Sequence, residues 1–189
     1  MVGTVITDDN KMKIVLLAYT LLLSIAVSFA QDGSLDLSFS TDGRVVVSIG
    51  TFDGQASAIA VQSDGKILVA GHSHNNSNYD FALVRFNSDG TLDNSFGSAG
   101  VVTTAIGTGD DKARAIALQS DGKIVVAGYS YTGSIDAIAV ARYNSNGSLD
   151  NTFDGNGMLT TSQGVYNEYA QGVAIQGDGK IVVTGVCIM

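Results

Sequence analysis

The chain lacks proline and tryptophan altogether, and it has one cysteine and two histidines among 189 residues. A single cysteine excludes a disulfide framework within the chain, and two histidines leave little for a histidine-rich metal site. Charged residues make up 15% of the chain, against roughly 25% in an ordinary soluble domain. Ten basic residues against 18 acidic ones give a net charge of −8, which argues against nucleic-acid binding. With 45% hydrophobic residues, the chain is not a disordered tail either.

The N-terminal segment, residues 1–30, has the pattern of a secretory signal peptide. Positions 14–27 form an uncharged apolar run that follows Lys11 and Lys13, and small residues at positions 28 and 30 supply a cleavage site. Even when it is extended to position 30, this run only reaches the lower length limit for a membrane span. We therefore predict a cleaved signal over residues 1–30, with Met12 as an alternative start of translation. The mature chain is expected to be secreted, periplasmic or on the cell surface, without a stable membrane span.

The rest of the chain is a tandem repeat. An Asp/Asn-Gly-Ser/Thr-Leu-Asp motif occurs three times at equal spacing, at residues 32–36, 89–93 and 146–150, which defines a 57-residue unit. A second motif, Asp-Gly-Lys-Ile, keeps the same spacing at residues 64–67, 121–124 and 178–181. Internal repeats of this length indicate stacked units that share a core. We divide residues 31–189 into complete units at 32–88 and 89–145 and a third, shorter unit at 146–189.

The sequence of the repeat predicts four short antiparallel strands per unit, so the predicted fold class is all-β. The first set of four strands is expected at 56–62, 66–73, 80–86 and 100–106, and an Asp-Gly turn at 64–65 joins the first two into a hairpin. The strands are almost continuously apolar, as expected when both faces of a sheet are covered. Repeated four-stranded units of this kind are typical of β-propeller blades. A parallel β-helix is the alternative, although its coils are usually shorter and lack a hairpin.

The first strand of each unit is expected to lie innermost. It carries small side chains at alternate positions, Ala56, Ala58 and Ala60 in the first complete unit, and blades leave little room where they converge.

The predicted strands add up to an incomplete ring. They make one closing strand near residues 44–49, two blades and half of a third, whereas closed propellers have 4–8 blades. An open blade face covers on the order of 400 Å². Two such faces exceed the apolar patch that a soluble monomer normally exposes. We expect the chain to be a fragment of a longer protein, or to need further blades of the same kind to close the ring.

With these motifs in view, the chain resembles the delta-60 repeat family of bacterial exported proteins. The matching segments are Asp80–Asn87, Asp89–Gly97 and Ala113–Gly128, and the resemblance extends from Asp32 to Gly185. It implies a β-propeller-like domain in a secreted or surface protein, with no established activity and no catalytic residues to carry over. The chain departs from the family after Gly185, where Val-Cys-Ile-Met replaces the expected final strand.

Two loops place oxygen-bearing side chains at alternate positions. A calcium site needs six to eight such ligands, but the spacing differs from an EF-hand and the terminal glutamate is missing. Asp and Asn also bond their own backbone in tight turns, and we favour this structural interpretation. No bound cofactor is expected, and calcium is the weaker hypothesis, with candidate ligands Asn87, Asp89, Asp93, Asn144, Asn146 and Asp150.

Aromatic and imidazole side chains at the blade ends predict a contact surface, because an apolar body with a polar tip suits binding. The residues are His72, His74, Tyr79, Tyr129 and Tyr131. A two-histidine metal site is disfavoured because the next unit has tyrosines in place of both histidines.

Three other side chains have structural interpretations. Arg85 and Arg142, which recur at one position of the repeat, are expected to pair with a neighbouring aspartate or to stack on an aromatic ring. Cys187 is expected to be a free thiol.

The chain has no nucleophile elbow, phosphate loop or Cys-x-x-Cys motif. We therefore expect a non-enzymatic binding or scaffold module for a protein or glycan partner. The alternative is a fragment of an exported carbohydrate-active propeller enzyme whose catalytic residues lie on other blades. A third hypothesis is a calcium-stabilised structural repeat.

Overall fold

The computed structural model describes residues 5–8, 11–14, 35–49 and 53–189. The chain divides into two compact units, residues 1–34 and 35–189. In the first unit, β1 (Val5–Asp8) and β2 (Lys11–Ile14) form an antiparallel hairpin. The apolar run and cleavage site of the predicted signal peptide lie almost wholly outside the described residues.

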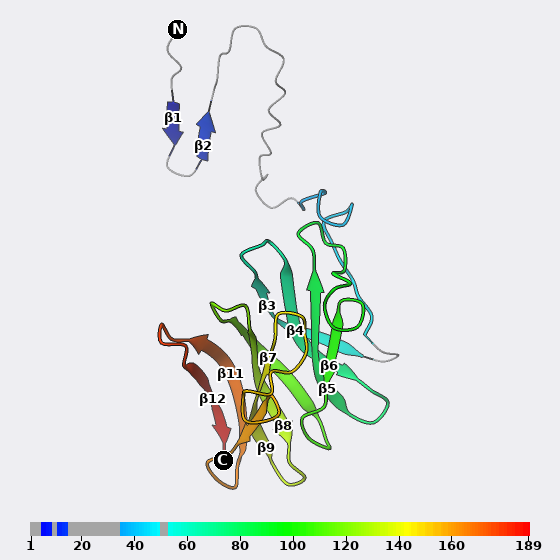
Figure 1. Ribbon diagram of the computed structural model, residues 1–189, viewed down its shortest axis with the longest axis vertical. Coiled ribbons are helices and arrows are strands. Elements are labelled where there is room, and N and C mark those ends of the chain that lie inside the picture. The colour runs from blue at the N-terminus through cyan, green and yellow to red at the C-terminus, as the bar shows by residue number, and fades with distance from the viewer. Residues whose placement is uncertain (1–4, 9–10, 15–34, 50–52) are drawn as a thin grey trace. The chain divides into compact units, whose positions relative to one another are not determined.

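The second unit consists of antiparallel strands (Figure 1). Blade 1 is a four-stranded sheet of β3 (Gly54–Val61), β4 (Ile67–His74), β5 (Tyr79–Phe86) and β6 (Val101–Thr104). Blade 2 repeats this order with β7 (Asp111–Leu118), β8 (Ile124–Tyr131), β9 (Asp136–Tyr143) and β10 (Met158–Thr161). A third hairpin pairs β11 (Asn167–Ile175) with β12 (Ile181–Ile188).

This arrangement confirms the predicted all-β class of β-propeller blades that do not close into a ring. Antiparallel four-stranded sheets are not the coils of a parallel β-helix. The described residues contain no helix, and therefore none long and apolar enough to cross a membrane.

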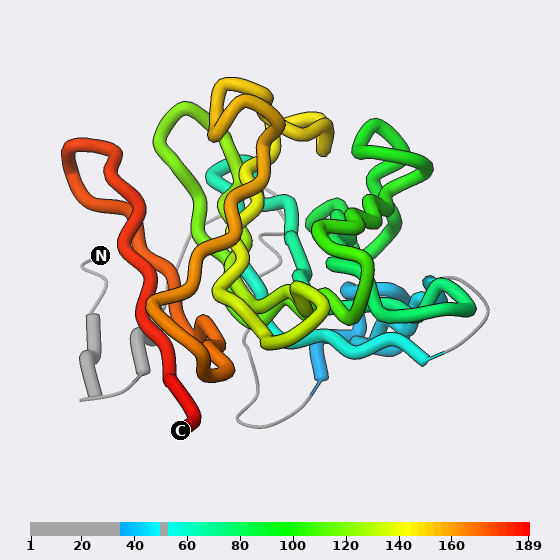
Figure 2. Tube along the Cα trace, turned by 90° about the horizontal axis from the view of Figure 1, so that it is seen from below, coloured from blue at the N-terminus to red at the C-terminus, as the bar shows by residue number. Residues whose placement is uncertain are grey.

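The core lies between successive blades. Alternate side chains of β8 point to opposite faces of its sheet, as the two-residue period of a strand requires. Ile124 and Val126 pack with residues of blade 1, including Leu68. Val125 and Ala127 pack on the other side, against residues of the third hairpin. Figure 2 shows this hairpin, in orange and red, beside blade 2. Blade 2 is thus covered on both faces, which explains the uninterrupted apolar runs in its sequence.

Two features of the repeat fix the geometry of the inner strands. A β-bulge interrupts β3, β7 and β11 at equivalent positions, which are Ser57, Arg114 and Gln171. A glycine of the facing strand lies next to each bulge because there is no room for a Cβ atom. A Cβ on Gly128 would come within 2.1 Å of the Lys112 carbonyl oxygen, and the same holds for Gly185 and Tyr169.

The first residues of each unit bind the preceding unit. The Ser40 N–H donates to the Asp89 carbonyl at 2.8 Å, and one repeat later the Gly97 N–H donates to the Asn146 carbonyl at 2.9 Å. Gly147 packs so closely on this neighbour that a Cβ atom would approach Phe96 to 3.0 Å. The recurring Asp/Asn-Gly-Ser/Thr-Leu-Asp motif therefore joins one repeat to the next.

The prediction of a closing strand at residues 44–49 is wrong. This segment has no strand pairing, although it corresponds to β6 and β10 one and two repeats later. Those strands pair with β5 and β9, and the described residues contain no equivalent strand before residue 44 for this segment to pair with. It lies beside blade 1 instead, where the Ser73 hydroxyl donates to the Ile49 carbonyl at 2.8 Å.

Candidate binding site

A cavity of about 310 Å³ lies between blades 1 and 2, on their inner strands. Its walls come from β3 and β4 of blade 1 and from β7 and β8 of blade 2. Most of the lining side chains are polar or charged: Gln55, Ser57, His72, Lys112, Arg114 and Tyr129. Two cations and an imidazole thus face one small space in a chain that is acidic overall.

Arg114 is held by aromatic rings. Its guanidinium carbon lies 5.1 Å from the ring centre of Tyr129 and 5.2 Å from that of Tyr169. These rings also touch each other edge to face, with centres 4.8 Å apart. The Tyr169 hydroxyl donates to an Asp136 carboxylate oxygen at 2.8 Å, which keeps that ring in place and raises the pKa of Tyr169. The arginine side chain is therefore positioned by cation–π contacts from two strands.

No carboxylate of the described residues forms an ion pair with Arg114, and its N–H groups make no hydrogen bond there. The other two arginines of the blades are both paired. Arg85 Nε donates to Asp93 Oδ2 at 2.8 Å, and Arg142 Nε donates to Asp150 Oδ2 at 2.7 Å. Among the described residues, Arg114 is thus the arginine of the blades without an ion-pair partner.

Lys112 and His72 line the cavity beside Arg114. Lys112 Nζ lies 4.2 Å from the centre of the Tyr79 ring and 3.1 Å from an Asp110 carboxylate oxygen. His72 meets the same Tyr79 ring edge to face at 5.1 Å. Burial, followed by the charge of Lys112, lowers the pKa of His72. Its Nδ1 is buried and has no hydrogen-bond partner among the described residues.

The structure brings together only some of the residues of the predicted contact surface. His72 and Tyr129, which occupy equivalent positions in blades 1 and 2, line the same cavity. His74 and Tyr79 are next to it, with ring centres 4.9 Å apart. Tyr131 is separate: its side chain is 39% exposed, and its hydroxyl donates to the Gly133 carbonyl. No group of three or more metal-ligating side chains occurs in the described part of the chain.

Sequence reasoning missed Lys112 and Arg114. A signal was present, because the inner-strand positions that alternate with the repeated small residues change from unit to unit. Position 112 corresponds to Gln55 and Tyr169, and position 114 corresponds to Ser57 and Gln171. Other positions of the unit also vary, as Tyr79 and Asp136 do, so variation singles out Lys112 and Arg114 only together with their place on the cavity.

The loop oxygens proposed as calcium ligands have protein partners, as tight turns require. The Asp89 carboxylate accepts the Thr91 N–H at 2.9 Å and the Thr91 hydroxyl at 2.7 Å, and Asn146 bonds Ser148 in the same way. The amides of Asn87 and Asn144 donate to a hydroxyl of their own loop. The hydrogen bonds from the Thr91 and Ser148 N–H groups are side-chain-to-backbone turns of the kind favoured in the sequence analysis.

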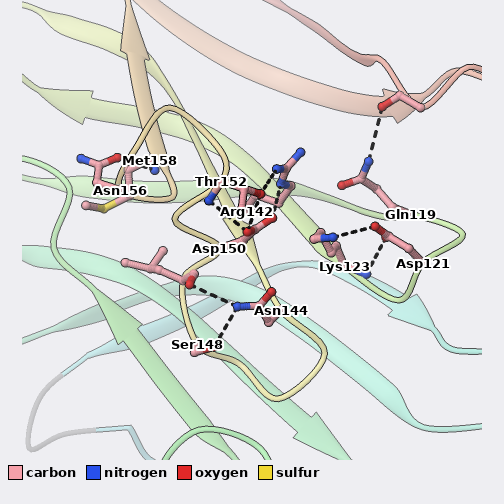
Figure 3. A network of polar contacts seen from close by, with 12 residues as sticks. Gln119, Asp121, Lys123, Arg142, Asn144, Ser148, Asp150, Thr152, Asn156 and Met158 are labelled. Atoms are coloured by element: carbon pink, nitrogen blue, oxygen red, sulfur yellow. Dashed lines mark hydrogen bonds and ion pairs between the residues drawn. The ribbon is translucent and has the colours of Figure 1, made fainter.

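The last two loop carboxylates bind cationic side chains. Figure 3 shows Asp150 between the Arg142 guanidinium and Thr152, whose hydroxyl donates to it at 2.7 Å. Asp93 is held in the same way and also accepts from Lys66 Nζ at 2.8 Å. The hydrogen bond from Lys66, followed by that from Ser95, holds the pKa of Asp93 well below its usual range.

The predictions for the other three side chains are confirmed. Arg85 and Arg142 pair with aspartates, and they also stack on Phe96 at 4.4 Å and on Phe153 at 4.9 Å. Cys187 is a free, exposed thiol on β12.

One buried acid lies near the site without lining it. The Asp111 carboxylate accepts the backbone N–H groups of Ile106 at 2.7 Å and Gly107 at 3.0 Å. Burial raises the pKa of Asp111. Glu168 occupies the equivalent position one repeat later and binds the Gln163 N–H in the same manner. Both acids fasten the loop that leads into an inner strand, so their role is structural.

Comparison with known proteins agrees with this architecture. A family model described as "Domain of unknown function (DUF5122) beta-propeller" matches residues 62–96 and 119–153. The two matches cover the same part of consecutive units, from the end of the inner strand to the aromatic residue that stacks on Arg85 or Arg142. The chain is therefore a β-propeller repeat protein, and it is similar over these segments to a family without an assigned function. A search of curated proteins found no match.

Proposed function

We propose that residues 35–189 act as a non-enzymatic binding or scaffold module that contacts a protein or glycan through the cavity between blades 1 and 2. The observation that supports this best is the contrast between framework and cavity. Framework positions keep the same residue in every unit, as Gly71, Gly128 and Gly185 do. The polar cavity positions change from unit to unit, from Gln55 to Lys112 and from Ser57 to Arg114. Variable side chains on a fixed scaffold are typical of binding surfaces.

We further propose that the module is displayed outside the cytoplasm. The support is the apolar run at residues 14–27 behind two lysines, which has the pattern of a signal peptide. The single cysteine does not distinguish an exported protein from a cytoplasmic one, so the proposal is tested by experiment. Expression of the whole chain with a C-terminal tag, followed by N-terminal sequencing of the exported product, is expected to give a new N-terminus near Gln31.

Further blades of the same kind are the partners proposed for the open sides of the module. Ile59 and Val61 on β3 are 66% and 64% exposed. Their counterparts in blade 2, Ile116 and Leu118, are partly buried and pack against the core between the blades. The same apolar positions are covered where a neighbouring blade is present, which supports a preceding blade as the partner of β3.

The binding proposal is tested with the full chain on immobilised glycans and extracellular proteins. We expect retention of a defined partner and a clear loss of retention for His72→Asn, because this side chain lines the cavity. Lys180→Gln is the matched control, since Lys180 is 75% exposed in a hairpin turn away from the cavity. Incubation of each bound glycan with the chain tests the enzymatic alternative. Reproducible cleavage that a cavity variant abolishes would overturn the non-enzymatic assignment.

A further inference from the structure

Building on the proposed binding function, we propose that the cavity between blades 1 and 2 binds a sugar carboxylate, the uronate residue of an acidic glycan. The assignment starts from the charge of the cavity. Arg114 has no ion-pair partner in the described part of the chain, and Lys112 and His72 line the same space. Lys112 is paired with Asp110 at 3.1 Å, so the charge that is not neutralised among the described residues is that of Arg114, and an anion would neutralise it on binding.

The shape of the cationic group selects a carboxylate. A guanidinium group can donate two parallel N–H bonds to the two oxygens of a carboxylate. Tyr129 and Tyr169 hold Arg114 at 5.1 and 5.2 Å from their ring centres, and its N–H groups bond no described residue. The aromatic rings thus orient the guanidinium and leave its donors for the ligand.

The neutral groups of the cavity favour a sugar over a bare anion. Gln55 and Ser57 on β3 line the same space and are exposed, so an amide and a hydroxyl are available next to the cations. These groups both donate and accept hydrogen bonds, which suits the ring hydroxyls of a sugar. The volume of about 310 Å³ is at the small end of ligand pockets and suits one sugar ring.

The repeat itself supplies a conservative variant for the test. Position 114 is occupied by Gln171 one repeat later, at the same β-bulge, so the scaffold accepts glutamine there. Arg114→Gln removes the charge and the paired donors without a residue that the fold disfavours. Arg44→Gln removes the same charge from an exposed position outside the cavity and is the matched control.

Isothermal titration of the full chain with digalacturonate, and with neutral galactobiose, measures the preference. We expect digalacturonate to bind at least tenfold more tightly. Arg114→Gln is expected to weaken digalacturonate binding at least tenfold, Arg114→Lys to weaken it by less, and Arg44→Gln to leave it unchanged. The urea midpoint of each variant, measured in parallel, shows whether the fold is intact.

Several results would overturn the inference. Digalacturonate binding that survives Arg114→Gln would place the site elsewhere. Equal or tighter binding of inorganic phosphate or of tetraglutamate would show that the site selects an anion other than a sugar carboxylate. If the chain retains a glycan or protein partner but does not bind digalacturonate, the inference fails and the proposed binding function stands. If nothing is retained at all, the proposed function fails as well.

Discussion

Blade 2 and the third hairpin place nearly the same sequence in very different surroundings. Strand β8 reads IVVAGYSY and β12 reads IVVTGVCI. All of β8 except Tyr131 is buried, whereas most of β12 is exposed. Val125 is fully buried, and its counterpart one repeat later, Val182, is 45% exposed. The apolar sequence of a blade therefore predicts that both faces of its sheet are buried, but the burial depends on the neighbouring blades.

This difference indicates that each blade draws its stability from lateral packing as much as from its own hydrogen bonds. Repeat proteins behave in this way, because each unit contacts only its neighbours and interface terms add to unit terms. Equivalent substitutions in blade 2 and in the third hairpin should then have unequal costs. The experiments that follow use such pairs, beginning with the largest expected effect.

The first pair is Gly128→Ala and Gly185→Ala. In both positions a methyl group would lie 2.1 Å from a backbone carbonyl oxygen of the facing inner strand. Blade 2 is packed on both faces, so we expect Gly128→Ala to lower the free energy of unfolding by about 3 kcal/mol. Gly185 lies on an exposed strand that can move away, and we expect a loss of about 1 kcal/mol. Urea unfolding of the full chain measures both, and equal losses would contradict the role assigned to lateral packing.

The second pair removes equivalent methyl groups. Val125 lies in the core between blade 2 and the third hairpin, so Val125→Ala should cost about 2 kcal/mol of unfolding free energy through lost burial and a cavity. Val182→Ala should cost about 0.5 kcal/mol, since that side chain already contacts water. The same urea titration provides the comparison. A Val182→Ala cost as large as that of Val125→Ala would mean that β12 is covered in solution.

The third experiment measures how stability depends on pH at Asp93. The Asp93 carboxylate forms ion pairs with Lys66 and Arg85. Its pKa in the folded protein lies below the unfolded value of about 3.9. The resulting stability is therefore complete above about pH 4 and is lost as the pH falls toward the lowered pKa. We expect Asp93→Asn to lower the urea midpoint at pH 7, and its difference from the unsubstituted chain to shrink between about pH 4 and 2.

The control for the acid experiment is Asp154→Asn, which changes an exposed aspartate in a turn. We expect it to leave the urea midpoint nearly unchanged across the same pH range. A constant difference between Asp93→Asn and the unsubstituted chain from pH 7 to 2 would show that the carboxylate charge is not what stabilises the fold.

The smallest effect is expected from calcium. The Asp89 and Asp150 carboxylates already accept hydrogen bonds from their own turns, and Asp150 also binds Arg142. Melting of the full chain in excess calcium and in chelator should differ by less than about two degrees, because a ligand stabilises only the state that binds it. A larger increase with calcium would restore the hypothesis of a calcium-stabilised repeat.

Much of the fold could be predicted because its signals are local. The Asp-Gly pair at 64–65 forms the expected turn, with Gly65 at φ +83°, and β4 and β5 begin within one residue of their predicted starts. Because the spacing of the repeat is constant, the strands predicted for one unit also predicted those of the next unit. The strand expected at residues 44–49 is absent, since this segment pairs with no described strand, and the positions one repeat before β5, residues 22–29, lie outside the described residues.

The site was only partly predictable because it forms between units. His72 and Tyr129 were recognisable as aromatic-type residues at blade ends, and they do meet. Arg114 differs from its counterparts Ser57 and Gln171, but nothing in its own strand separates it from any other polar strand residue. Its setting depends on the bulge in β7 and on Tyr169, which belongs to the next repeat and packs against Tyr129. Contacts of this kind come from the packing of separate sheets, which a strand pattern does not encode.

The hydrogen bonds that join successive units have a consequence for the order of folding. Blade 1 obtains its fourth strand, β6, and the Asp93 partner of Arg85 from the second repeat, so the sequence repeat and the blade are out of phase. During synthesis from the N-terminus, blade 1 stays incomplete until the chain has reached at least Thr104. Each new repeat therefore finishes the preceding blade before it starts its own. We expect assembly to be vectorial, with a single unfinished edge that advances along the growing chain.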